Sequence, residues 1–485
     1  MGGRVLVVTY YFPPSGGIGY ERTLKYATYL PRWGWQATVL TVKDAGYGLR
    51  DPESTRRVPP DLDVVRTRSS EPAKLRRGLG RVTRSVTRFG RSDAGAKADV
   101  AAASAPAKTG NAGSRWVGRT WQAVVTALFF PDAQLGWVPY AVRAGTAAVR
   151  RSGAQVVYST SSPISSHLVG GLIARRTKLP WVADFRDPWI GNAFAPKLPR
   201  WQRPLQRRLE RWIVRHAARV VFVSDEILDG YRARYPWAAD RFTVIPNGYD
   251  LNDLVPHAVE EAPAASEAAP AVVEETANDD ISGRFKLAYG GSVYGEHELE
   301  IFLDGLELLL RRRPDLRDRL AVEFIGWLTL HNQAVAARYD TPERLGSIVS
   351  YTGFLTHDEA LARLARADAL FNVIADEPEK WRISSGKLTE YIGLDRQIIA
   401  FVPEGAARDL LRELDWGVLA DPTPQGVADG IERLLVTPRP DRRADPEGRY
   451  DRVNLAARLA AVLDAVTEYH AAGLTGTADP GHPLS

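Results

Sequence analysis

Short hydrophobic runs alternate with amphipathic stretches through most of the chain. Six runs in the first half have the length and composition of buried β-strands: Arg4–Tyr10, Gln36–Val42, Gln155–Ser159, Trp181–Phe185, Arg219–Val223 and Phe242–Ile245. Helical patterns separate several of them. The first helical pattern, Glu21–Trp33, ends at Gly34, a typical helix C-cap. Strands that alternate with helices predict a doubly wound parallel sheet.

The same alternation starts again in the second half. Its predicted strands are Phe285–Gly290, Leu320–Gly326, Val349–Phe354, Ala369–Ile374, Gln397–Phe401 and Gly417–Leu419. Its predicted helices lie near Leu299–Arg312, Asp358–Ala367, Gly386–Leu394, Ala406–Leu414 and Gln425–Val436, and a last helix follows at Asn454–Ala471. Between the halves, residues 255–283 contain seven acids, no Lys or Arg and no useful periodicity, which is typical of a disordered linker.

We therefore expect two Rossmann-like α/β domains. The first spans residues 1–253 and carries a basic insertion at about 66–120, where 13 Lys and Arg stand against three acids. A linker at 254–283 leads to a second domain at 284–440. The region 441–485 is expected to hold a helix that packs back on the first domain, followed by a flexible tail. Open parallel sheets bind ligands beyond the carboxyl ends of their strands, so the cleft between two such domains is the expected site.

Composition says more about the cellular compartment of the protein than about the reaction it catalyses. The 485 residues include no cysteine, which excludes disulfides and thiol nucleophiles and fits a reducing cytoplasm. The N-terminal run is too short for a signal peptide, and no apolar stretch reaches the roughly 18 residues of a membrane span. We expect a cytoplasmic protein.

The basic insertion contains an amphipathic pattern at residues 72–91. Its apolar positions are Leu75, Leu79, Val82, Val86 and Phe89, with arginines over much of the remaining surface. Such a helix is typical of binding to an anionic membrane surface. The alternative is a helix whose apolar stripe packs on the protein core. Nucleic-acid binding is not expected, because aromatic residues are not interleaved with the basic ones.

The loop after the first strand, residues 11–20, is rich in proline and glycine. Gly16 and Gly17 would let backbone amides approach an anion at the start of the next helix. Gly17-Ile18-Gly19 also begins a dinucleotide fingerprint, but Arg22 stands where the third glycine belongs. A simple chain-reversing turn is the other interpretation.

Polar blocks follow several predicted strands. They are Tyr-Ser-Thr-Ser-Ser-Pro-Ile-Ser-Ser-His at 158–167, Asp-Phe-Arg-Asp-Pro-Trp at 184–189, Ile-Pro-Asn-Gly-Tyr-Asp at 245–250, Tyr-Gly-Gly-Ser-Val-Tyr at 289–294 and Ser-Ser-Gly-Lys-Leu-Thr-Glu-Tyr at 384–391. Asp61-Leu62-Asp63 has the spacing of a metal-binding D-x-D, but we interpret it as a solvated surface turn.

In this order, these blocks resemble the bacterial family-4 glycosyltransferases, and in particular a subgroup with a DFRDPW segment and an SGKL-EY helix start. Asp132 and Trp137 lie in two further stretches that resemble the subgroup, Pro131-Asp132 and Gly136-Trp137. The resemblance covers most of the chain outside residues 70–115, the linker and the tail. It implies a GT-B fold, a retaining reaction, a nucleotide-sugar donor and no required metal or other cofactor.

The donor site is predicted at the helix that begins near Ser385. Free amides and the helix dipole at Ser385 and Gly386 suit a phosphate, and Lys387 and Arg382 add positive charge. The resemblance assigns Glu390 to the ribose hydroxyls and places Gly291 and Ser292 on the donor side. The wider family often has a second glutamate eight positions earlier, where this chain has Arg382. The alternative is that Lys387 and Glu390 form an exposed i,i+3 pair.

The acceptor side is predicted in the first domain. Asp184 or Asp187 would orient the acceptor hydroxyl or stabilise oxocarbenium-like charge, and Arg186 would hold a phosphate. A structural network of ion pairs among these three residues is the alternative. His167, Asp132 and Trp137 are further acceptor-side candidates. His167 lies inside a helical pattern, where a lone histidine is more often structural.

These expectations combine into one leading function and two rivals. The leading function is transfer of a hexose from a UDP- or GDP-sugar to a hydroxyl of a saccharide or lipid-linked acceptor, in the synthesis of cell-surface polysaccharide or glycoconjugate. A catalytically inactive GT-B partner protein is the first rival. The resemblance implies a second glutamate at position 382 and a histidine near the strand end at Trp181–Phe185, and this chain has neither. A nicotinamide-dependent oxidoreductase is the second rival.

Overall fold

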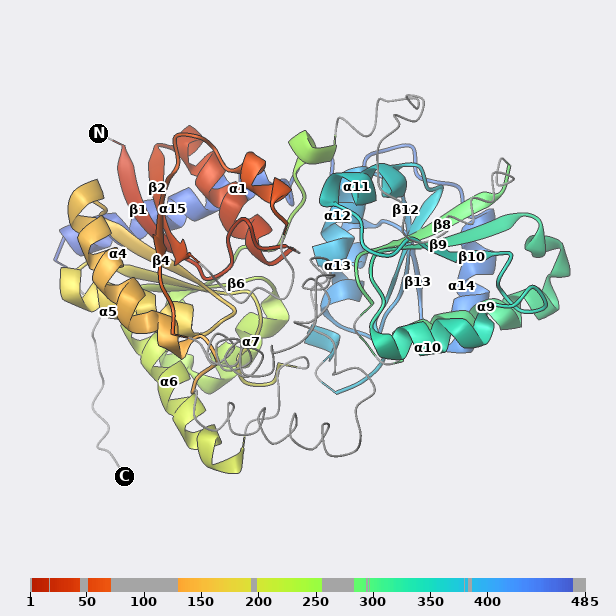
Figure 1. The fold of residues 1–485 in the computed structure, drawn as a ribbon, viewed down its shortest axis with the longest axis horizontal. Helices are drawn as coiled ribbons and strands as arrows, with labels where there is room; N and C mark the ends of the chain where they lie inside the picture. Colours follow the sequence, from red (N-terminus) through yellow and green to blue (C-terminus); the bar gives the residue numbers. More distant parts are fainter. Residues whose placement is uncertain are drawn as a thin grey trace, which may run out of the picture. The chain divides into compact units, whose positions relative to one another are not determined.

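The computed structural model describes two compact α/β units (Figure 1). Unit 1 comprises the chain up to Pro246 together with the segment from Arg452 onward, and unit 2 is Asn247–Asp451. The described residues are 2–16, 18–43, 51–70, 130–192, 199–254, 283–293, 295, 297–378, 380–382 and 386–473. The predicted amphipathic helix at 72–91 and nearly all of the predicted linker lie outside these ranges.

Unit 1 is built on a seven-stranded parallel sheet with strand order β3-β2-β1-β4-β5-β6-β7. The strands are β1 Gly3–Val8, β2 Trp35–Val42, β3 Asp63–Thr67, β4 Val156–Ser161, β5 Trp181–Phe185, β6 Arg219–Phe222 and β7 Phe242–Val244. The helices of this unit are α1 Glu21–Tyr29, α4 Val138–Ser152, α5 Ser165–Thr177, α6 Arg203–His216, α7 Asp225–Arg234 and α15 Arg452–Ala471.

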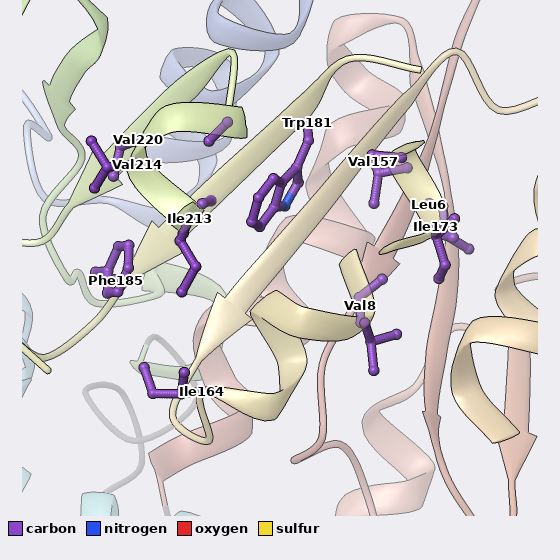
Figure 2. Close-up of a cluster of buried hydrophobic side chains, with 14 of the residues drawn as sticks. Leu6, Val8, Val157, Ile164, Ile173, Trp181, Phe185, Ile213, Val214 and Val220 are labelled. Atoms are coloured by element: carbon purple, nitrogen blue, oxygen red, sulfur yellow. The ribbon is translucent and has the colours of Figure 1, made fainter. Parts of the chain in front are cut away.

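Both faces of this sheet are buried, which explains the continuous hydrophobic runs of its strands. Leu6 and Val8 of β1 pack with α4, α5, α6 and α7 on one face, and this core is shown in Figure 2. Val5 and Val7 point to the other face, where α1 and α15 cover the sheet. The last helix thus belongs to unit 1, and the Trp35 indole donates a 2.9 Å hydrogen bond to Asp464 on α15.

Unit 2 repeats the design with six parallel strands in the order β10-β9-β8-β11-β12-β13. They are β8 Phe285–Gly290, β9 Leu320–Ile325, β10 Val349–Tyr351, β11 Ala369–Val373, β12 Gln397–Phe401 and β13 Val418–Ala420. The helices are α9 Glu298–Arg312, α10 Leu330–Tyr339, α11 His357–Ala365, α12 Gly386–Leu394, α13 Ala406–Leu414 and α14 Pro424–Val436. Helices α9, α10 and α14 cover one face, and α11, α12 and α13 the other.

The predicted fold class, two doubly wound parallel α/β domains, is confirmed. One detail was wrong: Asp63 does not belong to a free surface turn. It begins β3, the edge strand next to β2, and Arg151 of α4 donates to its carboxylate at 2.7 Å. None of the helices in the described part of the chain is long and apolar enough to cross a membrane.

Candidate functional site

A buried ion pair lies at the carboxyl edge of the unit 1 sheet. Asp184, near the end of β5, is fully buried and accepts two hydrogen bonds of 3.0 Å from the Arg22 guanidinium. Tyr158 and Thr160, from the neighbouring strand β4, donate to the same carboxylate at 2.6 and 2.9 Å. Burial alone would raise the pKa of Asp184, but the Arg22 charge and these hydrogen bonds outweigh it and hold that pKa below its ordinary value.

Four of the five N–H donors of the Arg22 guanidinium are engaged by the protein. Its remaining hydrogen bonds go to the carbonyl oxygens of Ile245 and Pro246, at 2.8 and 2.7 Å, where the chain leaves unit 1. The fully buried Asp184 therefore does not face an acceptor, in contrast to the prediction that it orients the acceptor hydroxyl. It is a structural ion pair, and its partner is Arg22 rather than the adjacent Arg186.

Arg186 also has its guanidinium engaged by the protein. Its three nitrogens donate to the backbone carbonyls of Ser161 at 2.5 Å, Ser162 at 2.8 Å and Gly19. Arg186 thus ties the loop after β4 to the loop after β1, and the contact with a phosphate stays a prediction. The next residue, Asp187, is exposed to solvent and stays a candidate for contact with a substrate.

Two predicted acceptor-side residues have structural roles. Asp132 accepts hydrogen bonds from the backbone N–H and hydroxyl of Ser165, at 2.9 and 2.6 Å, and so caps the start of α5 from a distant segment. Trp137 is fully buried, and its indole N–H donates to Thr67 at 2.7 Å. Asp132 thus holds a helix end and Trp137 fills the core, and their place on the acceptor side stays a prediction.

His167 is a core residue of α5. It is fully buried, its Nδ1 lies 2.8 Å from the Ser159 hydroxyl, and its ring packs on Phe185 with centroids 4.5 Å apart. Desolvation lowers the pKa of His167 to about 3, so the imidazole is neutral throughout the physiological range. This is the structural role that a histidine inside a helical pattern suggested.

The loop after β1 is held from several sides. Arg66 donates to the carbonyl of Pro13 at 2.6 Å, and the N–H of Asp51 donates to the carbonyl of Pro14 at 3.1 Å. Gly16 is half-buried at the end of this pinned stretch, and Gly17 lies outside the described residues. Because the carbonyl of Gly19 accepts a hydrogen bond from Arg186, the loop after β1 is fixed to the end of β5.

The carboxyl edge of the unit 2 sheet carries the predicted lysine. Lys387, in the first turn of α12, donates to the backbone carbonyl of Ser292 at 3.0 Å and to the Tyr289 hydroxyl. Its ammonium also lies 4.0 Å from the centroid of the Tyr289 ring. Both hydrogen-bonding partners are neutral, and both lie at the end of β8 or just after it. The lysine therefore does not belong to an exposed surface pair.

Desolvation lowers the pKa of Lys387 to about 7, and the nearby charges of Glu390 and Glu298 offset only part of that effect. A lysine near its titration point gains more from an incoming anion than one already neutralised by a carboxylate. The local electrostatics thus favour an anionic ligand at this side chain.

Around Lys387 the backbone is packed so closely that two positions have room for glycine but for no larger residue. Gly291 has a φ of +88°, and a Cβ there would lie 3.1 Å from Cε of Lys387. A Cβ on Gly326, whose φ is +144°, would meet the carbonyl of Gly291 at 2.6 Å. The N–H of Gly290 donates to the buried Tyr391 hydroxyl of α12 at 2.7 Å. The β8 loop and the start of α12 are thus fixed against each other.

The other predicted donor-site residues divide between the described and undescribed parts. Glu390 is half-buried one turn after Gly386, the first residue of α12, and its charge acts on Lys387. The structure therefore brings Gly291, Ser292, Gly386, Lys387 and Glu390 together. Ser385 and the side chain of Arg382 lie outside the described residues.

Sequence reasoning missed a charged cluster beside this site. Lys380, which is almost fully buried, lies 2.6 Å from Glu298 and 3.1 Å from Glu377, and Nδ1 of His297 contacts Glu377 at 2.8 Å. The cluster fixes the short helix Lys380–Arg382 to the start of α9. It lies just before the residues that lead into α12. The one sign of this cluster in the sequence is that Lys380 follows acidic residues such as Glu377.

Comparison with known proteins gives a family match to part of the chain and a fold. The family described as Glycosyltransferase Family 4 matches residues 76–253. None of the curated proteins matches the chain.

Solved structures match over nearly the whole chain. Anabaena Alr3699/HepE in complex with UDP and glucose is 15% identical, with 96% of this chain and 100% of that chain covered and a TM-score of 0.55. A glycosyltransferase from Rickettsia africae is 12% identical, with 98% and 100% covered and a TM-score of 0.56. The α,α-trehalose 6-phosphate synthase from Burkholderia multivorans is 13% identical, with 100% of both chains covered and a TM-score of 0.54.

These likenesses establish the fold, which is that of the GT-B glycosyltransferases. Together with the family match over residues 76–253, the fold supports a glycosyltransferase.

Proposed function

We propose that this chain transfers a sugar from a nucleotide-sugar, a UDP- or GDP-sugar, to a hydroxyl of a saccharide or lipid-linked acceptor. The proposal extends to a retaining reaction that requires no metal, in the synthesis of cell-surface polysaccharide or glycoconjugate at the inner face of the membrane. Unit 2 binds the donor and unit 1 the acceptor. Neighbours of the same fold were solved with UDP bound, which supports a nucleotide-sugar donor.

One observation carries the donor half of the proposal: the partly desolvated Lys387 lies over the glycine loop at the end of β8. Sugar transfer leaves a nucleoside diphosphate, whose negative charge must be stabilised as the glycosidic bond breaks. Lys387 supplies a positive charge, and the backbone at Gly291 has no side chain to block the approach of a phosphate. Glu390, on the same helix face, would accept hydrogen bonds from the ribose hydroxyls.

The acceptor half rests on Asp187. It is exposed at the carboxyl edge of unit 1, directly after an arginine whose hydrogen bonds fix the local backbone. An exposed carboxylate on this fixed backbone suits the orientation of an acceptor hydroxyl or the stabilisation of positive charge on the reacting sugar. Within unit 1 we assign this role to Asp187 and not to the buried Asp184.

The test combines a donor screen with two variants. The purified chain is incubated with a panel of UDP- and GDP-sugars, and mass spectrometry follows hydrolysis or transfer. UDP and GDP affinities are then measured by calorimetry. Lys387→Ala should weaken binding of the active nucleotide roughly 10–100-fold, as expected for a charged hydrogen bond. Glu390→Ala should weaken it by a similar or smaller factor.

The control is Arg311→Ala, which removes one exposed positive charge from the same unit and should bind nucleotide like the wild type. If both site variants bind like the wild type, the donor-site assignment fails. If no donor is hydrolysed or transferred by the pure chain while nucleotide still binds, the inactive-partner alternative replaces the enzyme. Binding of NAD in place of nucleoside diphosphates would point to the oxidoreductase.

A further inference from the structure

Helix α6 and the three residues before it present a row of arginines to solvent. Arg203, Arg207, Arg211 and Arg215 recur every four residues and therefore share one face of the helix over about 18 Å. Two more arginines, Arg200 and Arg208, lie beside this row. All six are exposed.

The positive charge of this face is not balanced within its own segment. The one acid between residues 200 and 216 is Glu210, which is fully buried against α7. Its carboxylate accepts hydrogen bonds from Tyr231 at 2.9 Å, Tyr235 at 3.0 Å and Arg234 at 3.2 Å. Glu210 thus anchors α6 to α7 and does not neutralise the exposed arginines.

Apolar side chains flank the arginine row on one side. Trp201 and Leu205, four positions apart, are 57% and 37% exposed. The half-buried Trp212 continues the same side of the helix and packs on Trp181, with ring centroids 5.9 Å apart. The inner face of the helix is anchored independently, since Ile213 and Val214 are part of the unit 1 core in Figure 2. The exposed tryptophan and leucine are therefore not needed for the core.

We propose that the outward face of residues 200–216 docks unit 1 on an anionic membrane surface. The arginine row would contact lipid phosphates, while Trp201 and Leu205 enter the headgroup region. Such a segregation of arginines from an apolar flank, on a rigid surface helix, is the arrangement of an interfacial helix. Single-stranded nucleic acid is a poorer match, because its binding sites interleave stacking aromatics with the basic residues along a groove.

The placement of α6 links this surface to the edge where unit 1 would bind its acceptor. The chain leaves β5 at Phe185 and enters α6 at Arg203, so the first turns of α6 lie toward the carboxyl edge of the sheet. The Gln206 amide donates to the carbonyl of Trp189, in the segment after Asp187, at 3.0 Å. The membrane face and the exposed carboxylate are thus tied through one short segment. This inference deepens the proposed function, because a lipid-linked acceptor is what gives the docking a use.

The experiment measures co-sedimentation of the full chain with phosphatidylcholine vesicles, with and without 30 mol % phosphatidylglycerol. We expect binding to the anionic vesicles alone, weakened by salt. The triple variant Arg203→Gln/Arg207→Gln/Arg211→Gln should bind about 100-fold more weakly, at about 1 kcal/mol per charge near the surface. The double variant Trp201→Ala/Leu205→Ala should lose roughly tenfold while keeping the salt dependence, because burial of apolar side chains adds to the electrostatic attraction.

The matched control is Arg311→Gln/Arg338→Gln/Arg412→Gln, which lowers the net charge by the same three units at exposed positions of unit 2. It should bind like the wild type. Equal losses in both triple variants would mean that net charge alone drives the binding and would overturn the proposal. So would retained binding in the α6 variant together with loss in a variant lacking residues 72–91.

Two further measurements distinguish membrane docking from nucleic-acid binding and from the proposed glycosyl transfer. Tight binding of single-stranded RNA at physiological salt, without vesicle binding, would also overturn it. Because co-sedimentation needs no sugar donor, docking and glycosyl transfer fail independently. UDP affinity in detergent-free buffer should be unchanged in the α6 variants, which shows that the fold and the donor site are intact.

Discussion

The two units place charged residues at equivalent edges of their sheets but use them in opposite ways. At the edge of unit 1, Asp184 and Arg22 satisfy each other, and Arg186 donates to backbone carbonyls. At the edge of unit 2, Lys387 is held by a phenol and a carbonyl, both neutral. The charged residues at the edge of unit 1 therefore stabilise the fold, whereas Lys387 at the edge of unit 2 can still bind an anion.

The difference is visible in the pKa values. The pKa of Asp184 is held below its ordinary value by Arg22, so the carboxylate is locked in its charged form. Desolvation instead lowers the pKa of Lys387 to about 7, where an anion can shift its protonation. A charged residue after a buried strand therefore indicates a ligand site when its hydrogen-bond partners in the protein are neutral and nearby opposite charges offset only part of its desolvation.

The largest effect is expected from breaking the unit 1 pair. Asp184→Asn leaves Arg22 buried without a counter-charge, and losing one partner of a buried ion pair typically costs about 3–5 kcal/mol. Thermal and denaturant unfolding should show a strongly destabilised unit 1. Asp63→Asn, which removes one partner of the exposed pair with Arg151, should change stability by less than about 1 kcal/mol. Equal stability of both variants would mean that Asp184 is not a structural anchor.

An intermediate effect is expected at Gly291. Alanine there must adopt a left-handed backbone and bring its Cβ to 3.1 Å from Lys387. The backbone strain alone is about 1–2 kcal/mol. Gly291→Ala should therefore weaken UDP or GDP binding several-fold by displacing the lysine. Gly473→Ala carries a similar positive φ with open space around it, and calorimetry should show unchanged nucleotide binding in that control.

The smallest effect is expected from Asp132→Asn. Both carboxylate oxygens of Asp132 accept hydrogen bonds, and asparagine keeps only one acceptor oxygen, so stability should fall by about 0.5–1 kcal/mol. Sugar transfer measured per folded molecule should be unchanged. A selective loss of acceptor turnover without loss of stability would restore Asp132 as an acceptor-side residue.

The sequence was sufficient for elements that are buried on both faces. Trp181–Phe185 and Gln397–Phe401 were predicted with the bounds that the structure has, because short and mostly apolar runs of this length favour a buried strand. The edge strand Asp63–Thr67 was missed. Only its last residue is buried, so polar residues interrupt the strand pattern.

The site was predictable where its geometry is local. A helix start that carries Gly386 and Lys387 in sequence necessarily places them together, and the glycines after β8 meet them at the same edge of the sheet. The role of Asp184 was not predictable in the same way. Its partner, Arg22, is 162 residues away in the sequence. The one signal in the sequence was that Arg22 stands in place of the third glycine of the dinucleotide fingerprint. No local pattern shows which acid that arginine pairs with.

Proton uptake on UDP binding tests the central claim most directly, because a diphosphate must raise the pKa of Lys387 if it binds there. At pH 8 most of the lysine is neutral, given a pKa of about 7. Binding enthalpies in two buffers of different ionisation enthalpy should therefore show a net uptake of protons on binding. The affinity should fall as the pH rises above 7, where protonation becomes part of binding. Lys387→Arg should abolish both effects; equal enthalpies in the two buffers for the wild type would contradict the account.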